Sequence, residues 1–300
     1  MTDEKVIVVT VNWNRYEDTC ACLDSLIAQE GVQVDLIVVD NGSTDNSETR
    51  LREKYPQLRI CKSEKNLGFA GGFNLGIGSA LNLDADRIMI INNDTVAEEG
   101  MIRALLDEMH SEEIGVTSPV IYYFSNPTKI WSCGGNFNKI VLTPINSHHK
   151  SETLSEPVNR TFLSGCCLLM KRELIESIGL FDERFFLYYE DLDYCLRIMH
   201  SKWRMKVVPA AKLLHKVSIS SGGELSPKER YYTALSSGLY YRKHMTLGNF
   251  IFIIPFRIIS TILWAFRLLF RGNFVGMSAF WEGMFDGSGL KKSSSDYQII

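Results

Sequence analysis

Several features that identify common classes of protein are scarce or missing in this sequence. The formal net charge is only −3 over 300 residues, which gives no electrostatic reason to expect nucleic-acid binding. None of the seven cysteines has the spacing of a zinc site, because Cys20 and Cys22 are too close together and Cys166 and Cys167 are adjacent. We therefore expect free thiols in a reducing compartment. The N-terminus leads directly into an apolar run without a signal peptide, so we expect a cytoplasmic protein.

Two common nucleotide-binding motifs are missing as well. No Gly-Lys-Ser/Thr completes a P-loop, and no G-x-G-x-x-G follows the first apolar run, which argues against a dehydrogenase. A nucleotidyltransferase of related fold would need a glycine-rich, arginine-bearing loop there, and residues 12–18 lack the glycines. Internal repeats, linkers and low-complexity tracts are absent, so we expect one α/β domain with a mixed second half rather than two independent domains.

The first 118 residues alternate between two hydrophobic patterns. Short apolar runs typical of buried strands occur at 6–11, 36–40, 59–61 and 88–91. Segments with helical spacing lie between them, at 17–29, 43–54 and 70–83, and Ser43 is expected to cap the second. This alternation predicts a parallel, doubly wound sheet. Further strands are expected at 120–124, 137–142 and 162–170, without regular helical crossovers.

Polar residues follow three of these strands at the point where each ends. They are Asn12 to Asn14, Asp40 to Ser43, and Asn92 to Asp94. Parallel sheets of this kind bind ligands beyond the carboxyl ends of their strands. One polar strand end is usually an ordinary turn, but three at the same edge favour a binding site. Gly71 and Gly72, at a helix start near this edge, allow close approach of a diphosphate.

The segment 182–197 contains the densest group of carboxylates. Glu190 and Asp191 follow five apolar or aromatic residues, a setting that disfavours the charged form and suits a general base. For Asp193 we prefer a structural interpretation, an i,i+4 ion pair with Arg197. His215 follows an apolar run, and an imidazole with one carboxylate would suit Mn²⁺ or Mg²⁺.

Together these segments resemble the inverting glycosyltransferases of family 2, which have a GT-A fold, and among them the bacterial rhamnosyltransferase-like branch. The resemblance covers roughly residues 5–220 and includes VTVNWNR (9–15), VVDNGSTD (38–45), NLGFAGGFNLGI (66–77), INNDT (91–95), LSGCCLLMKR (163–172), GLFDERFFLYYEDLDYCLR (179–197) and His215. It implies a Rossmann-like, mostly parallel sheet flanked by helices. It also implies a glycosyltransferase domain at 1–243, with a nucleotide-binding half at 1–118 and an acceptor half at 119–243.

The resemblance assigns a role to each matching residue. Asp191 would be the catalytic base and Glu190 its helper, Asp94 and His215 would hold the metal, and Gly165 would border the acceptor. The donor would be bound by Thr10, Asn12, Asn14, Asp40, Asn66, Gly72, Asn74, Asn92 and Asn93, with Asp40 accepting from the N3–H of uracil or thymine.

One residue departs from the family pattern. Asn92 stands where many members have the first aspartate of a D-x-D motif, so the bare metal site should be weaker and should depend on the diphosphate. We expect a hexosyl group, best L-rhamnosyl from dTDP-L-rhamnose, to move to a saccharide acceptor that is polyprenyl-diphosphate-linked. A UDP-hexose transferase and a non-catalytic sugar-nucleotide-binding protein are the alternatives. The Glu190–Asp191 pair counts against the latter.

The C-terminal part, 244–300, is expected to be a basic, amphipathic helical extension. Seven Lys or Arg residues lie between 242 and 292, against two acidic residues. The run 249–272 is apolar, but its arginines (Arg257, Arg267, Arg271) and Pro255 argue against a transmembrane helix. We expect an interfacial helix with the arginines facing the headgroups, which would make the protein peripheral on the inner face of the membrane. Docking on the catalytic domain or in a homodimer is the alternative.

Overall fold

The computed structural model describes residues 5–83, 85–146, 154–217 and 225–289. The chain divides into two compact units. The first consists of Met1–Asn136, Asn146–Glu183 and Glu190–Val217, and the second of Phe137–Ile145, Arg184–Tyr189 and Ser218–Ile300. The boundaries at 118 and 243 that the sequence suggested stay predictions.

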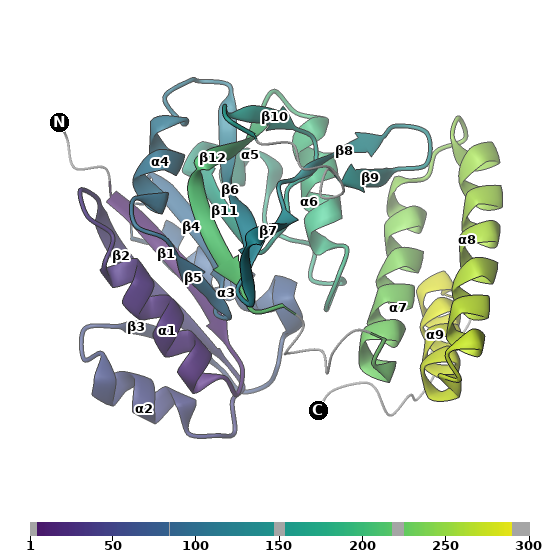
Figure 1. The fold of residues 1–300 in the computed structure, drawn as a ribbon, viewed down its shortest axis with the longest axis horizontal. Helices are drawn as coiled ribbons and strands as arrows, with labels where there is room; N and C mark the ends of the chain where they lie inside the picture. Colours follow the sequence, from purple (N-terminus) through teal and green to yellow (C-terminus); the bar gives the residue numbers. More distant parts are fainter. Residues whose placement is uncertain (1–4, 84, 147–153, 218–224, 290–300) are drawn as a thin grey trace. The chain divides into compact units, whose positions relative to one another are not determined.

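The first unit is built on a ten-stranded mixed sheet (Figure 1). Its strands are β1 (Lys5–Asn12), β2 (Gln33–Asn41), β3 (Arg59–Ser63), β4 (Arg87–Asn92), β5 (Thr95–Ala97), β6 (Ile114–Tyr123), β7 (Asn126–Ser132), β10 (Val158–Arg160), β11 (Cys167–Lys171) and β12 (Arg204–His215). The main path runs β10-β12-β6-β11-β4-β1-β2-β3, with β5 beside β12 and β7 beside β6. Strands β1 to β4 are parallel, and β11 runs antiparallel between β4 and β6. The predicted α/β architecture is confirmed.

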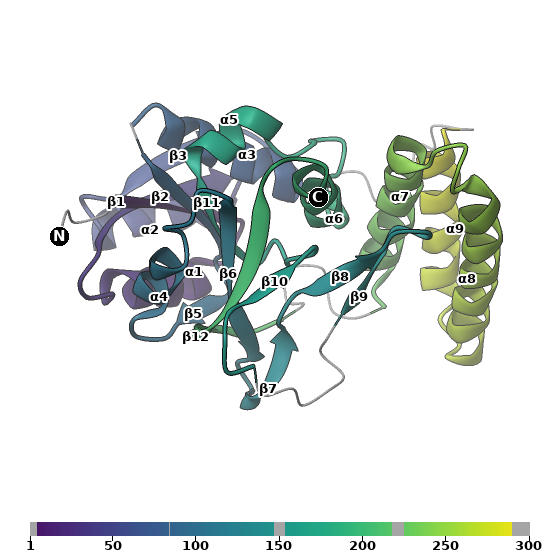
Figure 2. The ribbon, with the colours of Figure 1, turned by 90° about the horizontal axis from the view of Figure 1, so that it is seen from above.

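Helices cover both faces of this sheet. They are α1 (Tyr16–Ile27), α2 (Ser47–Lys54), α3 (Gly68–Leu81), α4 (Met101–Asp107), α5 (Arg172–Ile178) and α6 (Glu190–Met199). Figure 2 shows α1 and α4 on one face and α3 and α5 on the other. The close approach of α3 to the sheet requires Gly76, because a Cβ atom there would lie 2.2 Å from Cγ1 of Val9. The sequence therefore places a glycine-rich helix directly against the first strand.

Two local expectations are wrong. Helix α2 begins at Ser47 after Asn46, which has a left-handed φ of 60°, so Ser43 is not its cap. The strand expected at 137–142 ends at Asn138 in β8 (Gly135–Asn138), and residues 139–142 are instead the turn of a hairpin that leads to β9 (Thr143–Asn146). The Asn138 side chain accepts hydrogen bonds from the backbone N–H groups of Ile140 and Val141, at 2.9 and 3.2 Å, and so favours a turn over an extended run.

The second unit contains the helices α7 (Pro227–His244), α8 (Phe250–Phe270) and α9 (Phe274–Ser288). Helices α7 and α9 pack so closely that a Cβ atom at Gly283 would lie 2.2 Å from the carbonyl oxygen of Tyr231. The segment 184–189, which belongs to this unit, packs against α7 and α9, and Ser236 donates a hydrogen bond to the Leu187 carbonyl at 2.8 Å. Within this segment Tyr188 and Tyr189 have left-handed φ angles of 69° and 68°.

Helix α8 turns its more polar side inward. Arg257 is half-buried and donates to Ser237 Oγ at 2.9 Å, with the Tyr241 ring 4.5 Å from its guanidinium. The expectation that all three arginines face lipid headgroups is therefore wrong for Arg257. Pro255 lies inside the helix and does not end it. By length and composition α8 is able to cross a membrane.

Candidate active site

The carboxyl ends of β1, β2 and β4 meet at one edge of the sheet. Asn12 pairs with Asp40 in register, and Val11 pairs with Asn92. Asn12 and Asp40 are almost completely buried. The parallel topology thus brings together the three groups of polar residues that the sequence spaces along the first 94 positions.

Hydrogen bonds tie the first two strand ends together. The Asn12 amide donates to Asp40 Oδ1 at 3.3 Å and to Ser43 Oγ at 3.0 Å. Ser43 Oγ also accepts from the Asn14 backbone N–H at 3.1 Å, and Asn14 Oδ1 accepts from the Thr44 N–H at 2.7 Å. Ser43 therefore belongs to this network, a role that its helix-cap interpretation missed. Thr10 is also buried, two residues before Asn12 in β1 and on the same face of the strand.

The predicted donor residues on and before α3 are held by protein contacts. Asn66 Oδ1 accepts from the Gly68 N–H at 2.8 Å and from the Asn41 amide at 3.1 Å. A Cβ atom at Gly72 would lie 3.1 Å from Asn41 Nδ2, so this glycine allows close packing of the helix.

Asn74 binds the loop that leads toward the acidic pair. Its amide donates to the Phe181 carbonyl at 2.9 Å and to Glu183 Oε1 at 3.0 Å, and its oxygen accepts from the Phe181 N–H at 3.0 Å. Both amide hydrogens are therefore already used by the protein. The donor-binding roles of Asn66, Gly72 and Asn74 stay predictions.

Asp94 and His215 lie side by side although they are distant in sequence. Strand β5 pairs with β12, which sets His215 opposite Thr95, and the Lys216 N–H donates to the Asp94 carbonyl at 3.0 Å. His215 Nε2 is 3.2 Å from Asp94 Oδ1, and both side chains are buried. The Trp131 ring meets the imidazole edge-on, with 4.5 Å between centroids.

This pair fits a divalent cation with open coordination positions. A carboxylate oxygen and an imidazole nitrogen are both ligands that Mn²⁺ accepts. Within the described ranges, no group of three or more His, Cys, Asp or Glu side chains is arranged to hold a metal. Further ligands would have to come from water and from phosphate oxygens. His215 Nδ1 is buried without a hydrogen-bond partner among the residues that the structure describes.

The acidic pair lies at the start of α6. Asp191 Oδ2 accepts from the Gly165 N–H at 3.1 Å, and Oδ1 accepts from the Leu192 N–H at 2.8 Å. Burial raises the pKa of Asp191 to about 6, although these N–H groups act in the opposite direction. Burial, and then the Asp191 charge, raises the pKa of Glu190 well above its usual value. Asp191 is therefore mostly ionised at neutral pH, whereas burial and the neighbouring charge favour the neutral form of Glu190.

Glu190 is 5% exposed, and its Oε2 atom has no hydrogen-bond partner in the described part of the chain. The buried Asp193 forms the expected ion pair with Arg197 at 3.0 Å. That expectation is confirmed, and it separates a structural carboxylate from the two that precede it on the same helix.

The segment Gly165–Cys166 links the end of β4 to Asp191. The Gly165 N–H donates to Asp191, and the next residue, Cys166, accepts from the Asn92 N–H at 2.9 Å. Burial raises the pKa of Cys166, and the charges of Asp94 and Asp191 both add to this. A Cβ atom at Gly165 would lie 3.0 Å from Phe69 Cζ and 3.3 Å from Asp191 Cβ, so position 165 has no space for a side chain.

Comparison with known proteins gives consistent results. The model of Glycosyl transferase family 2 matches residues 7–179. The chain is 29% identical over 245 residues to an N-acetylglucosaminyl-diphospho-decaprenol L-rhamnosyltransferase of Mycobacterium tuberculosis, an alignment covering 74% of this chain and 79% of that protein. It is 27% identical over 244 residues to the dTDP-rhamnosyl transferase RfbF of Shigella flexneri, covering 76% and 78%.

A solved structure shares the fold. The mannosyltransferase PcManGT from Pyrobaculum calidifontis, in complex with GDP-Man and Mn²⁺, matches with a TM-score of 0.57 at 14% identity, covering 96% of this chain and 76% of that one. The fold is that of the GT-A glycosyltransferases.

Proposed function

The chain belongs to glycosyl transferase family 2, and from this premise we propose that it transfers L-rhamnosyl from dTDP-L-rhamnose, with inversion, to a polyprenyl-diphosphate-linked saccharide. This reaction would serve cell-surface polysaccharide synthesis. Two relatives support the donor and the acceptor: one is named as a rhamnosyltransferase of a diphospho-decaprenol-linked sugar, and the other as a dTDP-rhamnosyl transferase.

In this proposal the strand ends bind the nucleotide. Asp40, held by the Asn12 amide at 3.3 Å, accepts a hydrogen bond from the N3–H of thymine. Asp94 and His215 hold Mn²⁺ or Mg²⁺, which when bound would neutralise charge on the departing diphosphate. The amides of Asn92 and Asn93, next to Asp94 in the chain, face ribose or sugar.

Asp191 takes the proton of the acceptor hydroxyl. Its pKa of about 6 leaves it ionised at neutral pH yet basic enough to accept a proton. The raised pKa of Glu190, caused by burial and the Asp191 charge, disfavours a second negative charge beside the base. Gly165 lets the backbone approach Asp191 closely and donate to it, at the border of the proposed acceptor site.

The observation that supports this assignment most is the Gly165–Cys166 link. Two consecutive residues contact Asp191 and Asn92 through backbone hydrogen bonds of 3.1 and 2.9 Å. A base and a leaving-group site must lie on either side of one anomeric carbon for a single displacement with inversion. Two consecutive residues of the turn before β11 therefore hold the proposed base and the end of β4 near each other.

The direct test is sugar transfer by Asp191→Asn. We expect loss of transfer with dTDP affinity nearly unchanged, since Asp191 lies on the acceptor side. Transfer at the unsubstituted rate would refute the base assignment. A panel of dTDP- and UDP-sugars, assayed with Mn²⁺ or Mg²⁺, identifies the donor. Preference for a UDP-hexose would keep the enzyme class and replace the donor, whereas binding without turnover of any donor would favour a non-catalytic protein.

We also propose that α8 lies in the surface of the cytoplasmic membrane, close to a lipid-linked acceptor. Its exposed apolar side chains span an arc of about 240° at about 100° per residue. They are Phe250, Ile251, Phe252, Ile254, Phe256, Ile258, Ile259, Ile262, Leu263, Phe266, Leu269 and Phe270. An arc this wide exceeds the stripe of about 100° with which a helix contacts a protein core. Lipid is therefore a better match than a second copy.

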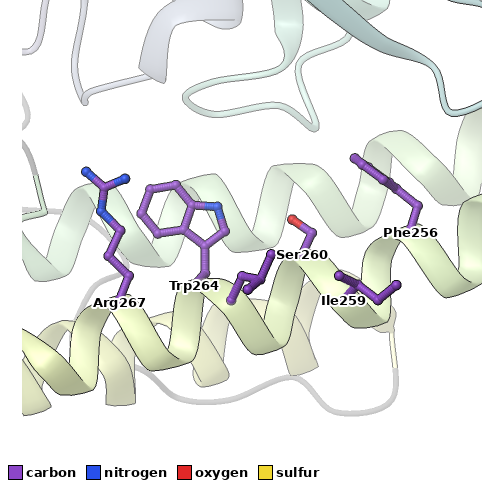
Figure 3. Close-up of a pocket in the computed structure, with 6 residues that line it drawn as sticks. Phe256, Ile259, Ser260, Trp264 and Arg267 are labelled. Atoms are coloured by element: carbon purple, nitrogen blue, oxygen red, sulfur yellow. The ribbon is translucent and has the colours of Figure 1, made fainter.

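A shallow groove on α8 combines apolar walls with a cationic end. It measures about 360 Å³ and is lined by Phe256, Ile259, Ser260, Leu263, Trp264 and Arg267. Trp264 and Arg267 point to the same side of the helix (Figure 3), and their ring-to-guanidinium distance is 5.0 Å. Tryptophan beside arginine is typical of the boundary between acyl chains and headgroups.

Flotation with anionic liposomes tests this surface. Leu263→Asp places a charge in the apolar arc and should reduce the floating fraction strongly. Ile27→Asp, at an equally exposed apolar position on α1, is the matched control and should float like the unsubstituted chain. Equal flotation of both variants refutes the membrane role of α8, and a Leu263→Asp variant that changes oligomeric state instead would support the homodimer.

A further inference from the structure

Helix α1, together with Gln29 just after its end, presents a row of polar side chains to the segment that contains Asp94. Thr19, Cys22, Ser25 and Gln29 are spaced three, three and four residues apart, which places them on one face of the helix. Ser25 Oγ accepts from the Ala97 N–H at 3.0 Å. Gln29 accepts from the Ile102 N–H at 3.2 Å and donates to the Glu98 carbonyl at 3.0 Å. This row therefore fixes the backbone from β4 to α4.

Thr19 differs from the other members of the row because it joins polar side chains at the carboxyl ends of β1 and β4. It is fully buried, and its hydroxyl accepts from the Asn93 amide at 2.9 Å. The same hydroxyl lies 2.8 Å from Asn12 Oδ1, to which it donates, and 2.9 Å from the Arg15 carbonyl. With its oxygen turned to Thr19, Asn12 must direct its NH₂ group to Asp40 and Ser43, as observed.

A continuous path of hydrogen bonds therefore runs from Asp40 through Asn12 and Thr19 to Asn93, the neighbour of Asp94. We propose that Thr19 is a positioning residue that couples recognition of the nucleobase at Asp40 to binding of the cation at Asp94. The hydroxyl is both donor and acceptor, so it fixes the orientation of two amides that would otherwise be able to turn over. This inference rests on the proposed function, since it requires a nucleotide at one end and a cation at the other.

The test measures the affinity for the nucleotide and the affinity for the cation separately. Thr19→Val keeps the shape and removes the hydroxyl, leaving the Asn12 oxygen and the Asn93 NH₂ group buried without their partner. We expect the affinity for dTDP in EDTA, and the affinity of the dTDP-bound protein for Mn²⁺, each to fall about tenfold. Thr19→Ser keeps the hydroxyl and should retain both affinities within about twofold. Thermal unfolding of each variant checks that the chain is folded.

Ser25→Ala is the matched control from the same row. It removes a part-buried hydrogen bond to the same segment, so it should lower stability measurably while leaving both affinities unchanged. A Thr19→Val variant that loses affinity for only one of dTDP and Mn²⁺ refutes the coupling. So does a Ser25→Ala variant whose two affinities fall as far as those of Thr19→Val. Should Thr19→Val fail to fold, Thr19→Cys, whose thiol is a weaker hydrogen-bonding group, should give smaller losses at both ends.

The outcome for the unsubstituted chain separates this inference from the proposed function. Failure of the unsubstituted chain to bind dTDP or Mn²⁺ refutes the proposed function and the coupling with it. Normal binding that Thr19→Val leaves unchanged refutes the coupling alone.

Discussion

The titration of Asp191 predicts how transfer activity depends on pH. A base whose pKa is about 6 is ionised in about one tenth of the molecules at pH 5 and in nearly all of them at pH 8. We therefore expect kcat/KM to rise about tenfold between pH 5 and pH 7 and then to level off. The rising part of this pH profile, its acid limb, follows from burial of the Asp191 carboxylate. An exposed aspartate would place the acid limb about two pH units lower.

Glu190→Gln gives this prediction its sharpest form. Burial and the Asp191 charge raise the pKa of Glu190 and so favour its neutral form, which glutamine matches in charge and shape. The variant should keep a limb near pH 6 and lose little activity at its plateau. Asp191→Asn should lose the reaction at every pH.

The assay is transfer from dTDP-L-rhamnose at several pH values, with the dTDP dissociation constant measured in parallel. Constant dTDP affinity across pH 5–8 assigns the limb to the base and not to the metal pair. A limb near pH 6 that disappears in Glu190→Gln, while Asp191→Asn remains active, would refute the assignment of the two carboxylates. A limb that follows dTDP affinity would refute its origin in Asp191.

Three further predictions concern stability and space. Because the pKa of Asp191 is raised in the folded state, its charge destabilises the fold above pH 6, and this cost vanishes below pH 4. Asp191→Asn removes the charge and loses one hydrogen bond. In urea unfolding it should therefore be about 2 kcal/mol more stable than the unsubstituted chain at pH 7, with no gain at pH 4. Gly165→Ala should reduce kcat at least tenfold with donor KM unchanged, because its Cβ atom meets Phe69 and Asp191; an unchanged kcat would contradict the packing. Gly283→Ala should destabilise the protein by about 1–3 kcal/mol through its clash with the Tyr231 carbonyl, and a melting temperature equal to that of the unsubstituted chain would count against the close contact of α7 and α9.

The sequence was most informative where local pattern and topology coincide. The strand ends at Asn12, Asp40 and Asn92 were expected to meet because parallel strands bring their carboxyl ends to one edge, and the register shows that they do. The Asp193–Arg197 pair was equally readable, because i,i+4 neighbours meet on any helix. One inference needs only the residue spacing of a helix, and the other only the parallel direction of neighbouring strands.

Contacts between elements were harder to foresee. Thr19 reads as one more residue on the buried face of an amphipathic helix, and its bonds to Asn12 and Asn93 depend on how α1 crosses two strands. Ser43 stands where a helix cap is expected, but its hydroxyl binds Asn12 instead. Arg257 falls on the polar side of a helical wheel, and a wheel does not distinguish water from the Ser237 hydroxyl of a neighbouring helix.

The amide at position 92 fits a site that already holds several carboxylates. Asp94 and Glu190 are buried, and the charges of Asp94 and Asp191 both act on Cys166, whose carbonyl binds the Asn92 N–H. An aspartate at 92 would add like charge to this region and, without a cation, would raise the pKa values of Glu190 and Asp191 further. A neutral residue avoids that cost, but it leaves the cation with fewer anionic protein ligands and so more dependent on diphosphate oxygens. Under the proposed function the cation and the donor would then bind best together, which is the situation in which a hydroxyl linking Asp40 to the neighbour of Asp94 has most effect.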